Sequence, residues 1–392
     1  MKPFEFFSTA RVVFGRGEVR RLGALAAAAG RSCLVVYNGG EPGDGGALGR
    51  ARHSLEAAGV GVRFFRQRGE PTVGDVERAV TAAREAECDV LVGVGGGSAI
   101  DAAKAAAGIL GNGGAALDYM EVIGKGRPIT RPAVPWVAVP TTAGTGAEVT
   151  RNAVLGDPAR KFKASLRGEL LLPRVALVDP EMGLGVPPGV TASSGMDALC
   201  QLIESYTSLN AQPITDALAM KGIGLVARSL RRAVADGTRV DAREDMALAA
   251  LLSGMALTQA GLGAVHGFAA PLGANFPAPH GTVCAALLPH VMAANIAALR
   301  TQSVRHPVLE RYADVGRSLR RQAGRDEAAA DAGVDEAAAL VADLHIPPLG
   351  RFGLTPARFP EMVALARQSS SMRYNPVVLS DQALAECLSR AL

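Results

Sequence analysis

Apolar residues follow two different patterns along this chain, and the pattern changes near residue 180. In the first part, short β-branched runs alternate with stretches of helical periodicity. The strand-like runs cover 11–14, 33–37, 60–65, 90–94, 136–139 and 175–179. The helical stretches between them cover 18–29, 47–58 and 73–86. This alternation predicts a parallel sheet with helices on both faces.

Past Pro180 the strand signals nearly vanish, and Ala- and Leu-rich helical periodicity runs from Thr191 to the end. The clearest predicted helices cover 213–235, 242–259 and 326–344. Pro347, Pro348 and Pro356 are expected to break the last helices into short pieces. We therefore predict two domains, an α/β domain over 1–180 and an all-helical domain over 181–392.

The composition is that of a folded protein with a large core. Of its 392 residues 48% are hydrophobic and 20% charged, which argues against disorder. The net charge of +4 is small for this length. Arginines gather at 228–232 and 317–325, where they fit solvated helix faces, so no nucleic-acid partner is expected.

The cysteines and the N-terminus indicate a cytoplasmic protein. Five cysteines are odd in number and far apart, which argues against a disulfide framework and a zinc knuckle. The apolar run at 22–29 resembles a signal peptide superficially, but Gly30 and the strand at 33–37 follow it, so we interpret it as a helix entering a strand. No apolar run is expected to span a membrane.

The strand at 90–94 is followed by three glycines and an alanine-rich helix. Ser98 is placed to cap that helix, with Asp101 three residues later as in a capping box. Glycines let backbone N–H groups approach a ligand, and a helix N-terminus adds partial positive charge. The turn therefore predicts a phosphate site, although a plain tight turn would have the same sequence.

A second turn, rich in glycine and threonine, covers 140–150 and follows the strand at 136–139. Its hydroxyls at Thr141, Thr142 and Thr145 could bind phosphate or ribose oxygens, or simply cap a turn. Two such turns at the carboxyl ends of strands favour a ligand, because open parallel sheets bind ligands at that edge.

The helical half carries a candidate metal cluster. Asp197 and Gln201 are four residues apart and share one helix face, with Cys200 beside them. His266 follows small apolar residues, and His280 lies in a Pro/Gly turn. Two histidines near an inward-facing carboxylate suggest a metal site, but their spacing alone does not prove one.

These motifs, in this order along the whole chain, resemble the iron-containing (group III) alcohol dehydrogenase family. The matching segments are 11–17, 95–101, 140–148, 177–181, 194–199, 279–281, 288–290 and 375–376. The resemblance implies an α/β N-terminal Rossmann-like domain for NAD(P) and an all-α C-terminal domain, a dehydroquinate synthase-like architecture. It also implies a site in the cleft between the domains, a homodimer, and a small alcohol or aldehyde as substrate.

The resemblance assigns cofactor contacts residue by residue. It implies that the pyrophosphate binds the glycine turn, that the threonines line the cofactor, and that Lys163 and Pro71 lie near the ribose and the nicotinamide. The implied cofactor residues are Asn38, Pro71, Gly95, Gly96, Gly97, Ser98, Thr141, Thr142, Thr145 and Lys163.

This chain departs from the family at three implied positions. Gln201 stands where the family has its first metal-ligand histidine, so the chain is predicted to be an atypical member that lacks one ligand imidazole. Ala270 replaces a histidine that relays a proton near the nicotinamide. Asn38 replaces the acidic residue on the adenosine ribose, which should permit NADP as well as NAD.

The sequence therefore predicts an NAD(P)-dependent alcohol dehydrogenase with His266 and His280 as catalytic residues. A divalent iron or zinc ion, if one binds, would use Asp197, Gln201, His266 and His280 and act as a Lewis acid. Asn152, Phe268 and Phe276 are the expected substrate-pocket walls.

Other functions stay open at this point. They are a metal-independent maleylacetate reductase-like enzyme, a lyase or sugar-phosphate dehydrogenase, and a cofactor-binding protein whose catalytic site has decayed.

Overall fold

The computed structural model describes residues 3–8, 11–43, 45–321 and 328–392. It divides into two compact units, which are described separately here. Residues 7–186 form an α/β unit, and residues 187–392 form a helical unit together with residues 1–6. The expected boundary at 180 and the division at 186 lie on either side of one short turn.

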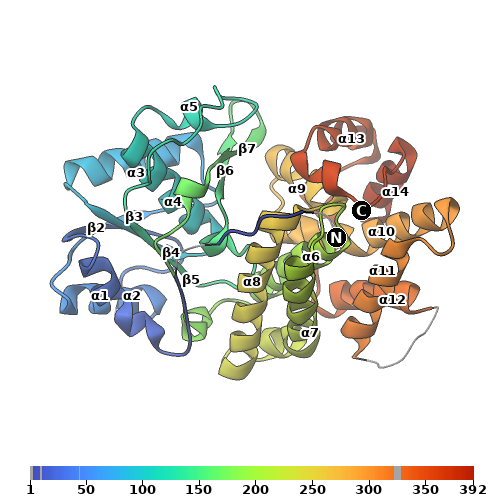
Figure 1. Cartoon of the computed structure of the whole chain (residues 1–392), viewed down its shortest axis with the longest axis horizontal. Helices are drawn as coiled ribbons and strands as arrows, with labels where there is room; N and C mark the ends of the chain where they lie inside the picture. The colour runs from blue at the N-terminus through green and yellow to red at the C-terminus, as the bar shows by residue number, and fades with distance from the viewer. Residues whose placement is uncertain (1–2, 9–10, 44, 322–327) are drawn as a thin grey trace. The chain divides into compact units, whose positions relative to one another are not determined.

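The α/β unit is built on a six-stranded parallel sheet (Figure 1). The strands lie in the order β1-β8-β5-β4-β2-β3. Their bounds are β1 Val12–Phe14, β2 Ser32–Tyr37, β3 Gly61–Arg66, β4 Val90–Gly95, β5 Trp136–Pro140 and β8 Val175–Val178. The predicted fold class is confirmed, because every strand-like run contributes a strand to this one sheet.

Helices cover both faces of the sheet (Figure 1). Leu34 and Val36 of β2 pack toward α3 and α4, while Cys33 and Val35 pack toward α1 and α2. Because successive side chains point to opposite faces and both faces are covered, β4 and all of β2 after Ser32 consist of buried residues, none of them charged. The helices are α1 Leu22–Ala27, α2 Ala47–Ala57, α3 Val73–Glu85, α4 Gly97–Asn112 and the short α5 Ala116–Tyr119.

An antiparallel hairpin stands apart from the main sheet, and the sequence pattern did not indicate it. Its strands are β6 Asn152–Asp157 and β7 Phe162–Arg167. Val154 on β6 is exposed, and charged residues interrupt β7, so the apolar signal is weak. The hairpin packs against α4 and α3.

The helical unit contains no strand among its described residues (Figure 1). Its helices are α6 Pro188–Thr207, α7 Pro213–Ala235, α8 Val240–Ala260, α9 Ala264–Asn275, α10 His280–Gln302, α11 Pro307–Arg320, α12 Ala329–Asp343, α13 Phe359–Arg367 and α14 Asp381–Arg390. Part of the predicted helix at 326–344 and of the arginine cluster at 317–325 lies outside the described residues, because 322–327 are not described.

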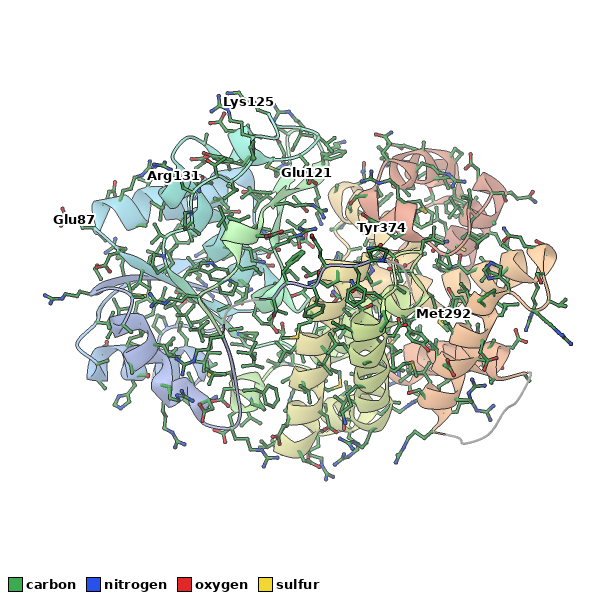
Figure 2. The ribbon with its side chains drawn as sticks, viewed as in Figure 1. Glu87, Glu121, Lys125, Arg131, Met292 and Tyr374 are labelled. Carbon is green, nitrogen blue, oxygen red and sulfur yellow. The ribbon has the colours of Figure 1, made fainter. Side chains whose placement is uncertain are left out.

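Helix α10 is the central helix of this unit. Met292, labelled in Figure 2, is almost fully buried, and α10 packs against α6, α9, α11, α12 and α14. The expectation that no apolar run reaches membrane-span length was wrong for 280–302, which is long and apolar enough. Burial gives the reason, since 72% of that segment is inside the protein, as in the core helix of a globular fold.

Candidate functional site

The turn between β4 and α4 starts a helix without a side-chain cap. Gly96 is the N-cap, so the expectation that Ser98 and Asp101 form a capping box was wrong. Instead, Asp101 accepts a hydrogen bond from Val154 N (3.1 Å) and faces Lys104 Nζ at 3.5 Å. The backbone N–H groups of an uncapped first turn are the usual binding site for a phosphate.

Glycine is required in this turn by space and by backbone conformation. Gly95 has φ +154°, and a Cβ there would collide with the Asn38 side chain. A Cβ at Gly97 would lie 2.8 Å from the side chain of Thr145. Neither position has room for a Cβ, so a larger residue would displace the Asn38 or Thr145 side chain.

The other predicted cofactor residues lie around the same turn. Gly95 pairs with Pro140 of the neighbouring strand, and Thr141 N donates to Gly95 O at 2.9 Å. Asn38, directly after β2, accepts a hydrogen bond from Gly96 N at 3.0 Å. The Oγ1 of Thr142 lies 3.1 Å from the Cβ position of Gly96. The structure thus brings together one cluster at the carboxyl edge of β2, β4 and β5.

Pro71 and Lys163 meet at the hairpin. Pro71 O accepts a hydrogen bond from Gly156 N at 2.8 Å, and Gly156 pairs with Lys163 across β6 and β7. The ammonium of Lys163 forms an ion pair with Glu70. Their assignment to the ribose and nicotinamide stays a prediction.

Helix α4 is tied to the hairpin by a buried lysine. Lys104 Nζ donates to Ala147 O (2.8 Å), Thr150 Oγ1 (2.8 Å) and Asn152 O (2.7 Å). Burial raises the pKa of nearby Glu148 to about 7, against the opposing effect of the Lys104 charge. These contacts fix the second turn relative to the first.

In the helical unit, four side chains from three helices converge. The nearest ligand atoms of Asp197 on α6, His266 on α9, and His280 and Cys284 on α10 all lie within 4.8 Å of one another. Asp197 Oδ1 is 3.2 Å from His266 Nε2 and 3.6 Å from His280 Nε2. Three of the four residues are buried, and His280 retains 38% side-chain exposure.

Close contact of α6 and α10 places Asp197 beside Cys284. A Cβ at Gly281 would collide with Ser193 O on α6, so glycine permits this approach. One turn further along, Cys200 Sγ donates to Cys284 O at 3.3 Å. Cys200 therefore makes a helix-to-helix contact, and it is not part of the four-residue group.

Two side chains hold the first turn of α9, where His266 lies. Glu204 Oε1 accepts a hydrogen bond from Val265 N (2.7 Å), and Asn375 Oδ1 accepts one from Ala264 N (3.1 Å). Glu204 Oε2 is 2.6 Å from His266 Nδ1. The carboxylate thus caps the helix and orients the imidazole, so that Nε2 faces Asp197.

Asn375 is itself fixed by a buried amide pair. Its Nδ2 donates to Asn295 Oδ1 at 2.7 Å, and Asn295 Nδ2 donates to Tyr312 OH at 3.0 Å. The neighbouring Tyr374, labelled in Figure 2, packs closely against Gly261 before α9. This network explains the family resemblance at 375–376 as a support for the start of α9.

Comparison with known proteins identifies these two units. Residues 9–180 match the family model described as iron-containing alcohol dehydrogenase, and residues 191–392 match that of the C-terminal part of the same family. The chain belongs to the iron-containing alcohol dehydrogenase family. It is accordingly an oxidoreductase that interconverts an alcohol and its carbonyl compound by hydride transfer with a nicotinamide cofactor.

Similar proteins cover most of the chain. The 1,3-propanediol dehydrogenase of Klebsiella pneumoniae is 37% identical, over 92% of this chain and 91% of its own length. The NAD-dependent methanol dehydrogenase of Bacillus methanolicus is 36% identical, over 77% and 78%. A crystal structure of 1,3-propanediol oxidoreductase covers both chains completely at 34% identity, with a TM-score of 0.92.

Within this family framework, Gln201 makes two hydrogen bonds. Its Nε2 donates to Asp197 Oδ2 at 3.3 Å, and its Oε1 accepts from Ser253 Oγ on α8 at 2.8 Å. The N–H group of the Gln201 amide therefore faces Asp197, while the oxygen that could bind a metal faces Ser253. The chain also carries Cys284 in the cluster, which the sequence analysis missed although it lies one turn after His280. Because Asp197, His266, His280 and Cys284 together offer four ligand atoms, the prediction that the chain lacks one metal ligand is not confirmed.

The cluster is strongly charged for a buried site. Burial by itself would lower the pKa of His266, but the Cys284 sulfur and the carboxylates of Asp197 and Glu204 raise it well above its usual value. Burial raises the pKa of the Cys284 thiol. Burial would also raise the pKa of Asp197, yet His280 and His266 lower it overall. Without a metal, these directions favour a protonated His266 beside an ionised Asp197 and a neutral Cys284 thiol.

The remaining predicted positions are scattered. Phe268 is completely buried in α9, and Phe276 lies beneath the Arg358 guanidinium, 5.1 Å from its ring centroid. Asn152 lies on β6 in the other unit. Their assignment to a substrate pocket stays a prediction. Ala270, one turn after His266 on α9, carries no titratable group.

Proposed function

We propose that this enzyme is a metal-assisted, NAD(P)-dependent dehydrogenase of small alcohols. The observation that carries the proposal is the convergence of Asp197, His266, His280 and Cys284, whose ligand atoms lie within 4.8 Å of one another. Negative charge develops on the substrate oxygen during hydride transfer, and a metal ion can stabilise it. This cluster provides the ligands for such an ion.

The α/β unit fits a dinucleotide. The uncapped first turn of α4 offers N–H groups for the pyrophosphate, and Thr142 and Thr145 flank the glycines there. The bound nicotinamide supplies the hydride acceptor or donor. Asn38 provides a neutral amide where an acidic side chain would repel a 2′-phosphate, which supports use of NADP as well as NAD.

The helical unit fits a divalent metal. Two imidazoles, a carboxylate and a thiol are ordinary ligands of zinc and related ions. Glu204 supports His266 from behind, as carboxylates do in metal sites. When bound, the ion supplies Lewis-acid polarisation of the substrate oxygen. The Asp197 carboxylate would balance part of its charge, and the partly exposed His280 leaves the site open to solvent on one side.

The alcohol must also lose one proton. Ala270 offers no acid or base one turn after His266 on α9. We propose that this proton passes to solvent without help from a side chain at 270, in contrast to a relay through an imidazole.

The substrate is proposed to be a short alcohol or its aldehyde, since similar proteins carry the names 1,3-propanediol dehydrogenase and methanol dehydrogenase. A panel of C1–C6 alcohols, diols and aldehydes should be assayed by nicotinamide absorbance with NAD and NADP. Each assay is run on chelator-treated protein with and without Zn(II), Fe(II) or Mn(II).

Metal-dependent turnover of one compound class would support the proposal. Full activity of verified metal-free protein would favour a metal-independent reductase. Tight NAD(P)H binding without turnover of any compound would favour a decayed site.

We also propose a cytoplasmic homodimer. The five cysteines are all free in the structure, which suits a reducing compartment. The dimer rests on the family resemblance, and light scattering of the purified protein tests it.

A further inference from the structure

Four of the six distances among the clustered ligand atoms match those of a tetrahedral metal site, and all six are within 4.8 Å. With ordinary zinc bond lengths, a tetrahedron has sulfur-to-nitrogen edges of about 3.6 Å and oxygen-to-nitrogen edges of about 3.4 Å. Cys284 Sγ lies 3.7 Å from His266 Nε2 and 3.6 Å from His280 Nε2. Asp197 Oδ1 lies 3.2 Å and 3.6 Å from the same two nitrogens. All four edges agree within about 0.2 Å.

Helix geometry explains why Cys284 reaches this point. His280 is the first residue of α10, and Cys284 lies four residues later, so both side chains share one face of the helix. The hydrogen bond that Cys200 Sγ donates to Cys284 O holds that turn of α10 against α6. Cys284 is fully buried, and its sulfur contacts the two imidazoles and Asp197.

The side chain of Gln201 is hydrogen-bonded to Ser253 and Asp197. Its oxygen accepts the hydrogen bond of Ser253, and its amide donates to the second carboxylate oxygen of Asp197. In that orientation Gln201 holds Asp197 with Oδ1 toward the histidines. It is a positioning residue for the site.

We infer that Cys284 is the fourth metal ligand, giving an Asp197, His266, His280, Cys284 site that selects thiophilic divalent ions such as zinc over iron. This inference rests on the proposed metal-assisted function and names its ligand set, to which the substrate oxygen would add as a fifth ligand during turnover. Thiolates are soft ligands and favour zinc, and the Cys284 thiol releases its proton to solvent when the ion binds.

Cobalt(II) substitution tests the ligand directly. Chelator-treated full-length protein is loaded with one equivalent of Co(II) under anaerobic conditions, and its absorption spectrum is recorded. A cysteine ligand produces a sulfur-to-cobalt charge-transfer band in the near ultraviolet, and tetrahedral geometry produces intense visible bands. We expect both in the wild-type protein, at one cobalt per chain. If cobalt binds without the charge-transfer band, the inference is overturned.

Three variants assign the sulfur. Cys284→Ser should lose the charge-transfer band and bind Zn(II) at least ~10-fold more weakly. Cys200→Ser, the matched control, removes a neighbouring buried thiol but keeps a hydroxyl that can donate to Cys284 O, so it should keep the band. Gln201→Ala should also keep it, because the amide is not a ligand. A band that survives in Cys284→Ser, or that disappears in Cys200→Ser alone, contradicts the inference.

The spectrum does not depend on turnover, so the two proposals fail separately. A protein with the charge-transfer band but no metal-dependent activity keeps the ligand assignment and overturns the proposed function. A protein with metal-dependent activity and no such band does the reverse. Circular dichroism of each variant shows that it is folded before its spectrum is compared.

Discussion

The carboxylate of Glu204 binds the imidazole of His266 and the start of its helix at the same time. Oε2 lies 2.6 Å from His266 Nδ1, while Oε1 accepts a hydrogen bond from Val265 N at 2.7 Å. Both groups are buried. Because one side chain fixes the helix start and the ring, the position of His266 Nε2 is set before any metal arrives.

Glu204→Gln should therefore weaken the metal site. A glutamine can offer its oxygen to Val265 N or to His266 Nδ1, but its amide N–H groups cannot accept from the other. We expect the Zn(II) dissociation constant to rise 10- to 100-fold, as in other sites that lose a supporting carboxylate. Competition with a chromophoric chelator measures it.

Glu386→Gln is the matched control, since Glu386 pairs with Arg390 on the exposed face of α14. It should leave zinc affinity unchanged. Equal zinc affinity in Glu204→Gln and the wild type would show that His266 does not need its carboxylate partner.

The main sheet could be predicted because its strands are buried on both faces. Val90 to Val94 contains no polar side chain, and a run of this kind is typical of a strand that is buried on both faces. The hairpin β6–β7 could not, because it lies outside that sheet and polar, charged or glycine residues interrupt the apolar positions of both strands. The expectation that no apolar run could span a membrane failed at α10, because a long buried core helix can be as apolar as a membrane helix.

The site was predictable where it depends on local sequence and not where it depends on packing. The glycine turn and Asp197, His266 and His280 are marked by residue type. Cys284 is one helical turn after His280, a spacing that places both on one face of α10, but its approach to Asp197 depends on the close contact of α6 and α10 at Gly281. The predicted capping box was wrong for a related reason, because the Asp101 carboxylate accepts a hydrogen bond from Val154 N of the hairpin.

The first turn of α4 predicts a cofactor-specific effect of Gly97→Ala. An added Cβ would lie 2.8 Å from the side chain of Thr145, which must then move into the space that a pyrophosphate needs. We expect the KM for NAD(P) to rise at least ~10-fold with little loss of thermal stability, since alanine is a better helix former. Steady-state kinetics and thermal denaturation test both expectations.

Gly74→Ala makes the same change in the first turn of α3. Its Cβ would find ordinary van der Waals distances, 3.5 Å from Arg78 Nη1 and 3.9 Å from Thr72 Oγ1. Cofactor KM should stay at the wild-type value. If Gly97→Ala and Gly74→Ala behave alike, the α4 turn has no special role in binding.

Asn38→Asp should shift the enzyme from NADP toward NAD. The new carboxylate can still accept the hydrogen bond from Gly96 N, so the turn is preserved. Its negative charge repels a 2′-phosphate and suits a ribose hydroxyl. We expect the ratio of kcat/KM for NADP to that for NAD to fall at least ~10-fold. An unchanged ratio would place the adenosine ribose away from Asn38.

Glu148 predicts a pH dependence of stability in the α/β unit. Burial raises its pKa from 4.5 to about 7 in the folded protein, while Lys104 opposes this change. Between these pH values the folded chain holds a proton that the unfolded chain has lost, so the stabilising contribution is complete below pH 4.5 and is lost as pH rises toward 7. The loss amounts to roughly 3 kcal/mol by conversion of the pKa difference.

Glu148→Gln removes this proton and should remove the associated slope. Relative to wild type, its free energy of unfolding is expected to increase as the pH rises from 5 to 8, with urea denaturation as the measurement. Asp101 and Lys104 are present in both proteins, so the difference reports residue 148 together with its effect on the Lys104 pKa, which the Glu148 charge raises. Glu121→Gln, an exposed partner of Arg167 labelled in Figure 2, should show the wild-type slope. A Glu148→Gln protein that becomes relatively less stable at higher pH would mean that Glu148 is ionised and stabilising beside Lys104.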